Sequence, residues 1–347
     1  MREYGGRKVI DLDRGTIIVT GGAGLIGSAL IWALNRRGID DIVVVDRLDA
    51  SEKWKHLVPL RFADYIEADE FARRIGEDED FGGAGTVFHL GACSSTTETD
   101  AAYLMRNNYE YTKNLAIWAE RNAERFVYAS SAATYGALED DLSDEADLAT
   151  LRPLNAYAFS KQLFDLYARR TGLDASVCGL KYFNVFGPNE DHKGEMRSMV
   201  HKAYEQIQSS GTVKLFKSYR PEFADGEQRR DFIYVKDAVA ITLHLAQSGA
   251  AGLFNVGSGS AHTWLDLVRP IFRALDRPER IEFVEMPERL RGKYQYSTCA
   301  TQHRLRAAGY ATPVTPLEDA VTDYVANYLV PGRCLDPADA TAAPLPA

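Results

Sequence analysis

The feature that most constrains the fold is a glycine-rich turn between a strand pattern and a helical pattern near the amino terminus. Residues 16–20 read TIIVT, and the stretch that ends at Gly38 carries apolar residues at helical spacing. Gly21, Gly24 and Gly27 lie at the junction, in the spacing GxxGxxG. Glycines there let the backbone approach a pyrophosphate, whose charge a helix N-terminus favours. The motif therefore favours dinucleotide binding, although a glycine turn can also arise for packing alone.

Further apolar strand patterns occur at residues 41–48, 85–92 and 125–132, and helical patterns such as 107–121 lie between them. Continuous apolar strands that alternate with helices indicate a parallel sheet covered on both faces. We therefore predict an α/β fold with a doubly wound parallel sheet, the Rossmann arrangement, and a smaller α/β substrate domain.

The rhythm of strands and helices breaks after about residue 182. The sequence RRDFIYVKDAVAITLHLAQ, residues 229–247, indicates one more strand and helix that return to the sheet. The stretches on either side are richer in proline, arginine and short elements. The predicted division is a dinucleotide-binding domain of residues 15–182 plus 231–256, a substrate-binding domain of 183–230 plus 257–330, and flexible ends at 1–14 and 331–347.

Composition excludes several classes of function. Four scattered cysteines without a CxxC pair favour a reducing cytoplasm and no metal centre. A net charge of −9 argues against nucleic-acid binding. The amino terminus lacks a secretory signal pattern, and no apolar run approaches the roughly 20 residues that span a bilayer. We therefore expect a cytoplasmic protein without a membrane partner, in which basic side chains gathered at one site serve a small anionic ligand.

The second strand pattern ends in Asp46, nineteen residues after Gly27. A carboxylate at this position can accept hydrogen bonds from ribose hydroxyl groups, which by itself favours NAD. Arg47 and Lys53 follow, and both could cover a 2′-phosphate. They could also be solvated surface cations. We favour NADP as the cofactor, with NAD as the alternative.

A serine, a tyrosine and a lysine occur in an order that suggests hydride chemistry. Ser131 follows the fourth strand pattern, and Tyr157 and Lys161 are spaced i, i+4, on one helix face. In this geometry Lys161 can lower the tyrosine pKa and hold a cofactor ribose. The phenol can then exchange a proton with a substrate hydroxyl group, assisted by Ser131. The combination with the glycine turn is stronger evidence than the YxxxK pair alone.

These motifs resemble the extended short-chain dehydrogenase/reductases, the NAD(P)-dependent sugar epimerase family. Within it, the segments GACSSTTE, YASSAATYG, YFNVFGPNEDHKG, KLF, RRDFIYV and RGKYQ resemble the branch that acts on ADP-heptose. The resemblance runs from about residue 16 to residue 328. It implies a homo-oligomeric epimerase that inverts carbon 6″ of ADP-D-glycero-β-D-manno-heptose, a nucleotide-sugar substrate, for lipopolysaccharide core synthesis.

The resemblance also implies roles for individual residues. Tyr157 and Lys193 would be the catalytic pair. Cofactor contacts are implied at Leu25, Ile26, Asp46, Arg47, Lys53, Leu90, Gly91, Ala92, Cys93, Ser94, Asn107, Lys161, Val185 and Lys193. Substrate contacts are implied at Asn184, Glu195, Lys202, Phe216, Lys217, Ser218, Tyr219, Arg230 and Tyr294.

The sequence departs from the family pattern at several positions. Glu195 stands where a small polar residue is common, a family glycine near Ser218 is missing, and Ala68 replaces a lysine that some members use for the cofactor. The loop at 217–231 is longer than usual. These departures leave the reaction type intact and concern the diphosphate contacts.

An epimerase must remove hydride from one face of a carbinol and return it to the other. Because the intermediate ketone has to turn, its oxygen can leave the reach of Tyr157, and Lys193 can then serve the second face. The alternative for Lys193 is a solvated loop or a phosphate anchor. Another epimerase, such as a 4-epimerase, is the nearest alternative function. A dehydratase would need an acidic residue after Ser131, where this sequence has Ala132 and Ala133. A non-catalytic dinucleotide sensor would have lost the Tyr/Lys pair, which this sequence retains.

Overall fold

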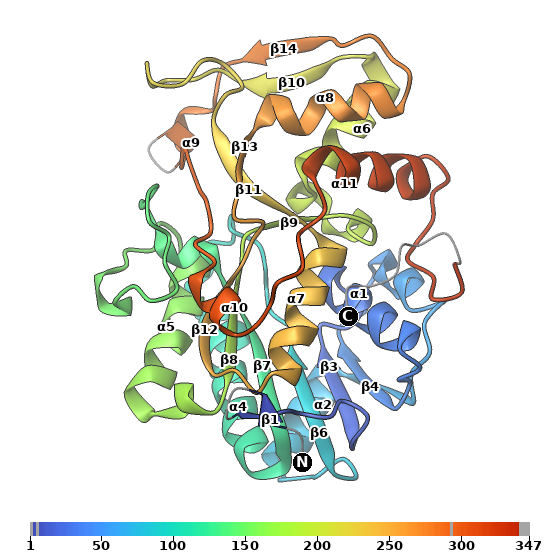
Figure 1. Ribbon diagram of the computed structural model, residues 1–347, viewed down its shortest axis with the longest axis vertical. Helices are drawn as coiled ribbons and strands as arrows, with labels where there is room; N and C mark the ends of the chain where they lie inside the picture. Colours follow the sequence, from blue (N-terminus) through green and yellow to red (C-terminus); the bar gives the residue numbers. More distant parts are fainter. Residues whose placement is uncertain (1–2, 5–6, 292–293, 340–347) are drawn as a thin grey trace.

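A computed structural model describes residues 3–4, 7–291 and 294–339. A seven-stranded parallel sheet within this part of the chain forms the centre of the larger domain (Figure 1). In spatial order its strands are β12 (Gly252–Val256), β8 (Cys178–Tyr182), β7 (Ala123–Ser131), β6 (Ala84–His89), β3 (Thr16–Thr20), β4 (Ile42–Asp46) and β5 (Asp64–Glu67). The predicted doubly wound sheet is therefore confirmed.

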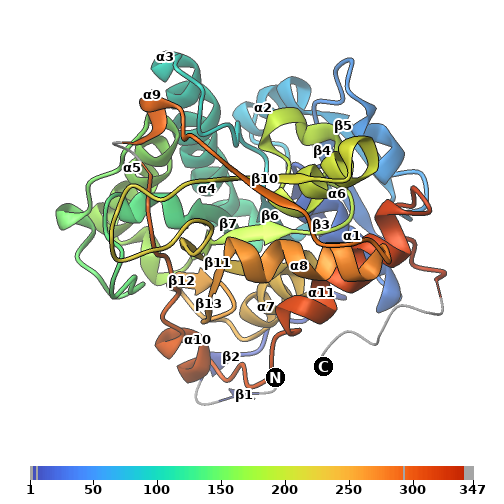
Figure 2. The same cartoon turned by 90° about the horizontal axis from the view of Figure 1, so that it is seen from above.

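Helices cover both faces of the sheet, as Figure 2 shows from above. Alternate residues of β3 point in opposite directions: Ile17 and Val19 pack with one set of helices and Ile18 with the other. The first set includes α1 (Leu25–Arg36) and α7 (Val235–Gln247). The second set includes α2 (Ala68–Gly76), α4 (Tyr111–Asn122) and α5 (Ala156–Thr171). Apart from the edge strand β5, the strands are almost wholly buried, which explains their continuous apolar patterns.

The predicted helix at 107–121 is part of a longer helical stretch. It begins with α3 (Ala101–Leu104), which is capped by the side chain of Asp100. It continues through the π-helical segment η2 (Met105–Glu110) and ends with α4. Asp100 accepts a hydrogen bond from the backbone N–H of Tyr103 (2.9 Å), which satisfies one of the free donors at the helix start.

A smaller group of elements lies at the top of Figure 1, above the large sheet. Two parallel strands, β10 and β14, lie beside helices α6 and α8, and a three-stranded sheet of order β13-β11-β9 connects this group to the larger domain. The elements of this group and of the connecting sheet are β9 (Asn184–Phe186), α6 (Met199–Ser210), β10 (Val213–Phe216), β11 (Arg229–Tyr234), β13 (Ala261–Thr263), α8 (Trp264–Ala274), β14 (Ile281–Val284), α9 (Glu288–Arg291), α11 (Leu317–Tyr324) and η7 (Val325–Leu329). Helix α10 (His303–Ala307) lies lower, against β12 of the large sheet.

One predicted strand lies in a different sheet from the one we expected. The strand in RRDFIYV is present as β11, but it pairs with β9 and β13 rather than joining the large sheet. The edge of the large sheet beside β8 is filled by β12 instead. Both strands contain a short run of buried apolar residues, at 232–234 in β11 and 253–254 in β12, and such a run alone does not specify which sheet the strand joins. The helix that follows, α7, does pack on the large sheet beside α1.

Parts of both ends that we expected to be flexible pack against the larger domain. Ile10 and Leu12 are buried, and the backbone N–H of Ile10 donates to the carbonyl oxygen of Gln247 (2.8 Å). Leu335 is fully buried, and its N–H donates to the side chain of Asn189 (3.1 Å). Trp32 donates from its indole nitrogen to the carbonyl oxygen of Asp336 (3.1 Å). Among the residues described, no helix has both the length and the apolar character needed to cross a bilayer.

Candidate active site

A cleft of about 670 Å³ lies where the carboxyl ends of the large sheet meet the smaller group of elements. In a doubly wound sheet this edge is where ligands bind. The cleft brings together eighteen of the predicted site residues: Gly21, Gly24, Leu25, Ile26, Gly27, Asp46, Lys53, Leu90, Gly91, Ala92, Ser94, Ser131, Tyr157, Lys161, Asn184, Val185, Lys193 and Arg230.

The glycine turn has no room for side chains at two positions. A Cβ atom on Gly27 would lie 2.1 Å from the carbonyl oxygen of Gly21. Gly21 has a φ of +69°, and a Cβ atom there would lie 2.7 Å from the backbone nitrogen of Gly91. Helix α1 begins just beyond this turn, with its N-terminal residues lining the cleft. A compact backbone cradle beside a helix N-terminus fits a pyrophosphate.

Asp46 is fixed by three hydrogen bonds at the end of β4. Its carboxylate accepts from the backbone N–H of Ala23 (2.8 Å) and of Arg47 (2.7 Å). The ammonium group of Lys53, from the 3₁₀ helix η1 (Glu52–His56), lies 2.7 Å from the same carboxylate. The carboxylate and Lys53 therefore enter the cleft together, as an ion pair.

Arg47 points toward two acidic residues beyond β4. Its guanidinium group donates to Asp69 and lies 3.9 Å from Glu67. Burial acts to lower the Arg47 pKa, but the hydrogen bond and charge of Asp69 outweigh it, so the pKa is raised. Of the two predicted phosphate-binding cations, Lys53 is therefore the one that lines the cleft.

Ser131, Tyr157 and Lys161 meet in the cleft as their order in the sequence predicted. Helix α5 carries Tyr157 and Lys161 on successive turns and is capped by Asn155, which accepts from the N–H of Ala158 (2.8 Å). Burial raises the pKa of Tyr157, and a hydrogen bond with Ser131 opposes this shift.

Lys161 is buried at the base of the cleft. Its ammonium group donates to the carbonyl oxygen of Ala129 (2.9 Å), and burial lowers the Lys161 pKa to about 8. A lysine with this pKa is partly neutral near pH 8, which suits a group that tunes proton transfer at a neighbouring phenol.

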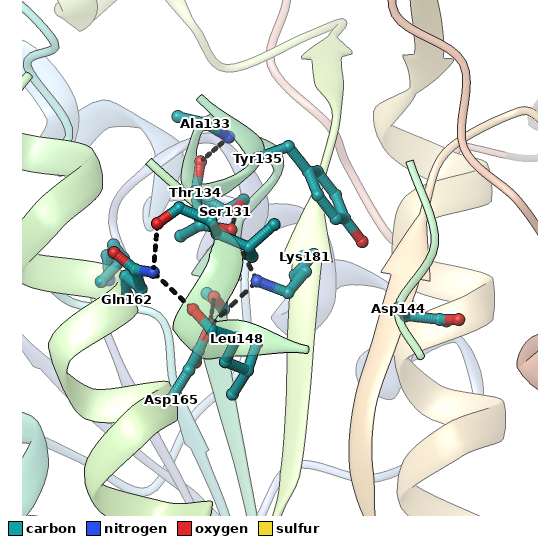
Figure 3. A network of polar contacts seen from close by, with 12 residues as sticks. Ser131, Ala133, Thr134, Tyr135, Asp144, Leu148, Gln162, Asp165 and Lys181 are labelled. Carbon is teal, nitrogen blue, oxygen red and sulfur yellow. Dashed lines mark hydrogen bonds and ion pairs between the residues drawn. The ribbon is translucent and has the colours of Figure 1, made fainter. Parts of the chain in front are cut away.

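A polar network behind Ser131 holds β7, β8 and α5 together (Figure 3). Lys181 and Asp165 form a buried ion pair (3.0 Å), and Asp165 also accepts from Ser130 (2.7 Å) and Tyr128 (2.9 Å). Lys181 also donates to the hydroxyl group of Thr134 (2.5 Å). Asp165 lies one turn beyond Lys161 on α5, so this network fixes the helix that carries the tyrosine and the lysine.

Lys193 enters the cleft from a loop that contains the 3₁₀ helix η6 (Asp191–Met196). Its backbone N–H donates to the carbonyl oxygen of Glu190 (3.0 Å). Glu190 is fully buried, and its carboxylate accepts from the N–H (2.7 Å) and hydroxyl group (2.6 Å) of Ser198. Burial lowers the pKa of Lys193, although the charge of Glu190 opposes the shift.

Arg230 and Trp264 line the part of the cleft nearest the smaller domain, and Tyr294, a predicted contact outside this lining, packs against Arg230. The guanidinium carbon lies 4.9 Å from the ring centre of Tyr294 and 5.8 Å from that of Trp264. The hydroxyl group of Tyr294 accepts from the Trp264 indole N–H (2.8 Å). Burial lowers the pKa of Arg230. A cation held between rings in this way suits an anionic or planar group.

The remaining predicted contacts lie outside this lining. Glu195 is almost fully exposed and pairs with Lys202 (3.6 Å). The other residues contact protein groups outside the cleft. Lys217 forms an ion pair with Glu285 (2.8 Å), and the guanidinium group of Arg291 lies over the Tyr219 ring (4.1 Å). The remaining contacts are hydrogen bonds: from the Ser218 N–H to Asp225 (2.7 Å), from Gln228 to the Phe216 carbonyl oxygen (3.4 Å), from the Cys93 N–H to Asn108 (2.9 Å), and between Asn107 and Tyr103.

The sequence did not single out several residues that line the cleft. Arg197 is one, and its position four residues after Lys193 in the same loop was a usable signal. Trp264 and Gln295 are others, from α8 and from the segment after it, and no motif marks them.

With the fold and the cleft established, comparison with known proteins identifies the class. The profile of the NAD dependent epimerase/dehydratase family matches residues 17–257, and the chain belongs to this family. An ADP-L-glycero-D-manno-heptose-6-epimerase of Nitratidesulfovibrio vulgaris (strain DP4) is 53% identical over 314 residues, covering 90% of this chain and 97% of that protein. A Fusobacterium nucleatum protein of the same name is 46% identical over 325 residues, covering 90% of this chain and 98% of that protein.

A solved structure supports the same relationship. The crystal structure of the Helicobacter pylori ADP-L-glycero-D-manno-heptose-6-epimerase has a TM-score of 0.75 and 27% sequence identity, and the match covers 94% of this chain and 99% of that one. The match includes the smaller domain as well as the sheet.

Proposed function

We propose that this protein is an epimerase that inverts carbon 6″ of ADP-D-glycero-β-D-manno-heptose and yields the L-glycero epimer. One observation carries the proposal: Tyr157 from α5 and Lys193 from the η6 loop line the same cleft as the glycine turn. Two groups able to transfer protons, on different elements, can serve the substrate oxygen on both faces of the carbinol. The relatives named above support ADP-heptose as the substrate.

The cofactor we propose is NADP, held along the glycine turn and Asp46. Bound nicotinamide would supply reversible hydride transfer. The proximity of Lys53 to Asp46 supports NADP over NAD, because the ammonium group offsets the carboxylate and can face a 2′-phosphate. Leu90, Gly91, Ala92 and Val185 line the cleft beyond the turn and would border the rest of the dinucleotide.

In the first half-reaction, Tyr157 accepts the proton of the C6″ hydroxyl group. Its hydrogen bond with Ser131 assists this step, because it favours the ionised phenol. A positive charge on Lys161, one turn along α5, would act in the same direction. The ketone that results must turn within the cleft before hydride returns to its opposite face. Its oxygen then accepts a proton from Lys193, whose lowered pKa makes the ammonium group a better acid than an exposed lysine.

The nucleotide diphosphate would lie toward the smaller domain. Arg230 is a buried cation that lines that side of the cleft, and Asn184 of the paired strand β9 lines it too, opposite Phe232. We propose that Arg230 binds the diphosphate and that Tyr294 and Trp264 orient its guanidinium group. The residues at 216–219 are proposed to border the nucleotide from the longer loop.

The direct test is to incubate the purified protein with ADP-D-glycero-β-D-manno-heptose and no added cofactor, and to follow carbon 6″ by NMR. The expected result is an equilibrium mixture of the two epimers without net oxidation. Conversion of a UDP-hexose at carbon 4, with ADP-heptose unchanged, would instead identify a 4-epimerase. Catalysis of neither reaction by protein that retains bound dinucleotide would favour a non-catalytic sensor.

A further inference from the structure

A histidine beside the proposed active site has a hydrogen-bond arrangement that the mechanism does not use. His56 is fully buried at the end of η1. Its Nδ1 atom lies 2.8 Å from the carbonyl oxygen of Ala23, in the glycine turn. Its Nε2 atom lies 2.7 Å from a carboxylate oxygen of Asp191, at the start of η6. One ring therefore contacts both the cofactor-side turn and the loop that carries Lys193.

Both partners of this ring accept hydrogen bonds. A backbone carbonyl oxygen and an ionised carboxylate have no proton to donate, and a neutral imidazole has only one N–H group. Burial acts to raise the pKa of Asp191, but the hydrogen bond and charge of His56 outweigh it, so the pKa is lowered and Asp191 is a carboxylate. The two contacts are therefore both satisfied when His56 carries a proton on each nitrogen.

A metal ion is the other cation that could join these groups, because His192 brings a third donor atom to within 4.8 Å of the other two. The distances favour a proton. Two ligands of a tetrahedral zinc ion, each about 2.0–2.1 Å from it, lie roughly 3.3 Å apart. The 2.7 Å between His56 and Asp191 is instead the length of a charge-assisted hydrogen bond.

We propose that doubly protonated His56 is a positioning residue for Lys193. Its two hydrogen bonds, to Asp191 and to the Ala23 carbonyl oxygen, connect the Lys193 loop to the glycine turn. We call this connection the tie, and both of its hydrogen bonds form only while the ring carries both protons. The inference rests on the proposed role of Lys193. Asp191 lies two residues before Lys193, and the His192 ring packs edge-on against His56, with ring centres 5.1 Å apart. A shift of this loop would therefore move the Lys193 ammonium group relative to Tyr157.

Titratable groups from several elements lie around the contact between His56 and Asp191. His192 is neutral near pH 7, because burial and the charge of His56 lower its pKa to about 4. The titratable groups around this cluster include Asp46 of β4, Lys53 and Lys55 of η1, Glu190, Asp191, His192 and Lys193 of the η6 loop, His201 of α6, Tyr324 of α11 and Cys334 of the carboxyl-terminal segment.

The substitution Asp191→Asn removes the negative charge at position 191 and keeps a side chain that can hydrogen-bond to His56. An asparagine amide can donate to the unprotonated Nε2 atom while Nδ1–H still donates to Ala23, so a neutral His56 completes the tie. We therefore expect the ratio of kcat in Asp191→Asn to kcat in wild type to rise with pH, because only the wild type needs the second proton on His56 to complete both contacts. Ionisations of Lys161 and Lys193 affect both proteins and cancel in this ratio.

Asp191→Ala removes the tie at every pH. The expected loss is roughly ten- to a hundredfold in kcat with KM little changed, because a reacting group is displaced while the binding surface remains. His303→Asn, at an exposed histidine of α10, is the matched control and should leave both constants unchanged. A kcat ratio independent of pH, or Asp191→Ala with normal kcat, would overturn the proposal.

The charge of His56 is tested independently of the reaction. Nitrogen NMR of protein labelled at histidine should show both ring nitrogens of His56 protonated at pH 7 in wild type and one in Asp191→Asn. A neutral ring in wild type, or a stoichiometric metal ion in the purified protein, would exclude the protonated tie. Failure of Lys193→Met to affect epimerisation would instead refute the proposed function and leave this spectrum unchanged.

Discussion

The ammonium nitrogen of Lys53 lies 2.7 Å from the carboxylate of Asp46, seven residues earlier in the chain. Both side chains are mostly buried, and Asp46 is held by two further backbone N–H groups. The carboxylate at the end of β4 therefore does not present an isolated negative charge to the cleft. This pairing decides how the chain should discriminate between NADP and NAD.

Replacing Lys53 with methionine should weaken NADP binding more than NAD binding. A hydrogen bond from an ammonium group to a charged acceptor contributes about 1.5–3 kcal/mol, so we expect roughly a ten- to hundredfold rise in the Kd for NADP. Lys55→Met is the matched control, since Lys55 is two residues away and pairs with Glu52. Calorimetric titration of protein stripped of nucleotide measures both constants. Equal losses for NADP and NAD would count against a 2′-phosphate contact at Lys53.

The buried ion pair behind Ser131 makes a prediction about stability. Lys181→Met leaves Asp165 charged and without its cation, and breaking one partner of a buried pair costs about 3–5 kcal/mol. Urea unfolding should show this loss, whereas Lys214→Met, at an exposed lysine 3.8 Å from Glu282, should change stability by less than about 1 kcal/mol. The double variant Lys181→Met/Asp165→Asn should recover part of the loss. Unchanged stability in Lys181→Met would show that the network does not hold the sheet and α5 together.

Tyr157→Phe should lower kcat for epimerisation by at least about two orders of magnitude, in line with the usual effect of removing a general acid or base. The phenyl ring fills the same space, so the cofactor content of the purified protein should stay normal. Steady-state kinetics on ADP-heptose, with nucleotide content measured after denaturation, makes the comparison. Near-full activity in the variant would remove Tyr157 from the mechanism.

His89 gives the chain an acid-sensitive core. Its Nε2 atom is 2.8 Å from the hydroxyl group of Thr112, which itself donates to Asn108, so the ring must donate there. Its Nδ1 atom is 2.7 Å from the hydroxyl group of Thr20, which can donate to it. These bonds need a neutral ring, and burial lowers the His89 pKa to about 3.

Stability should therefore fall as pH falls from about 6.5 toward about 3. In this window the unfolded chain binds a proton at His89 that the folded chain does not, and stability rises with pH wherever the unfolded state binds more protons. The full effect is on the order of 5 kcal/mol. Unfolding measured across this range should show a shallower slope in His89→Gln than in wild type. Identical slopes would mean that other groups cause the acid loss.

Features formed by residues close together in the sequence could be predicted, whereas contacts between distant residues could not. The glycine turn and the Tyr157–Lys161 pair are local patterns, and both lie where we expected. The place of β11 was not predictable because an apolar strand pattern does not specify its neighbour. The His56–Asp191 contact joins residues 135 positions apart, and a lone histidine followed by a charged loop contains no spacing signal that would reveal it.

The substitution that best separates epimerisation from one-sided hydride transfer is Lys193→Met. If Lys193 transfers a proton on one face only, its loss should suppress epimerisation from either epimer, because every full cycle uses both faces. We expect a fall in kcat of at least about two orders of magnitude with KM little changed. The partial reaction that Tyr157 serves, for instance reduction of an added aldehyde surrogate, should be much less affected.

Two measurements keep this prediction falsifiable. Cofactor content and the unfolding curve of Lys193→Met exclude misfolding, and Lys214→Met controls for the loss of a lysine elsewhere in the smaller domain. A lysine that only binds the diphosphate contributes equally to ground state and transition state, so its loss raises KM and leaves kcat nearly unchanged. That result would contradict the two-base mechanism, because Tyr157 would then have to serve the substrate oxygen on both faces.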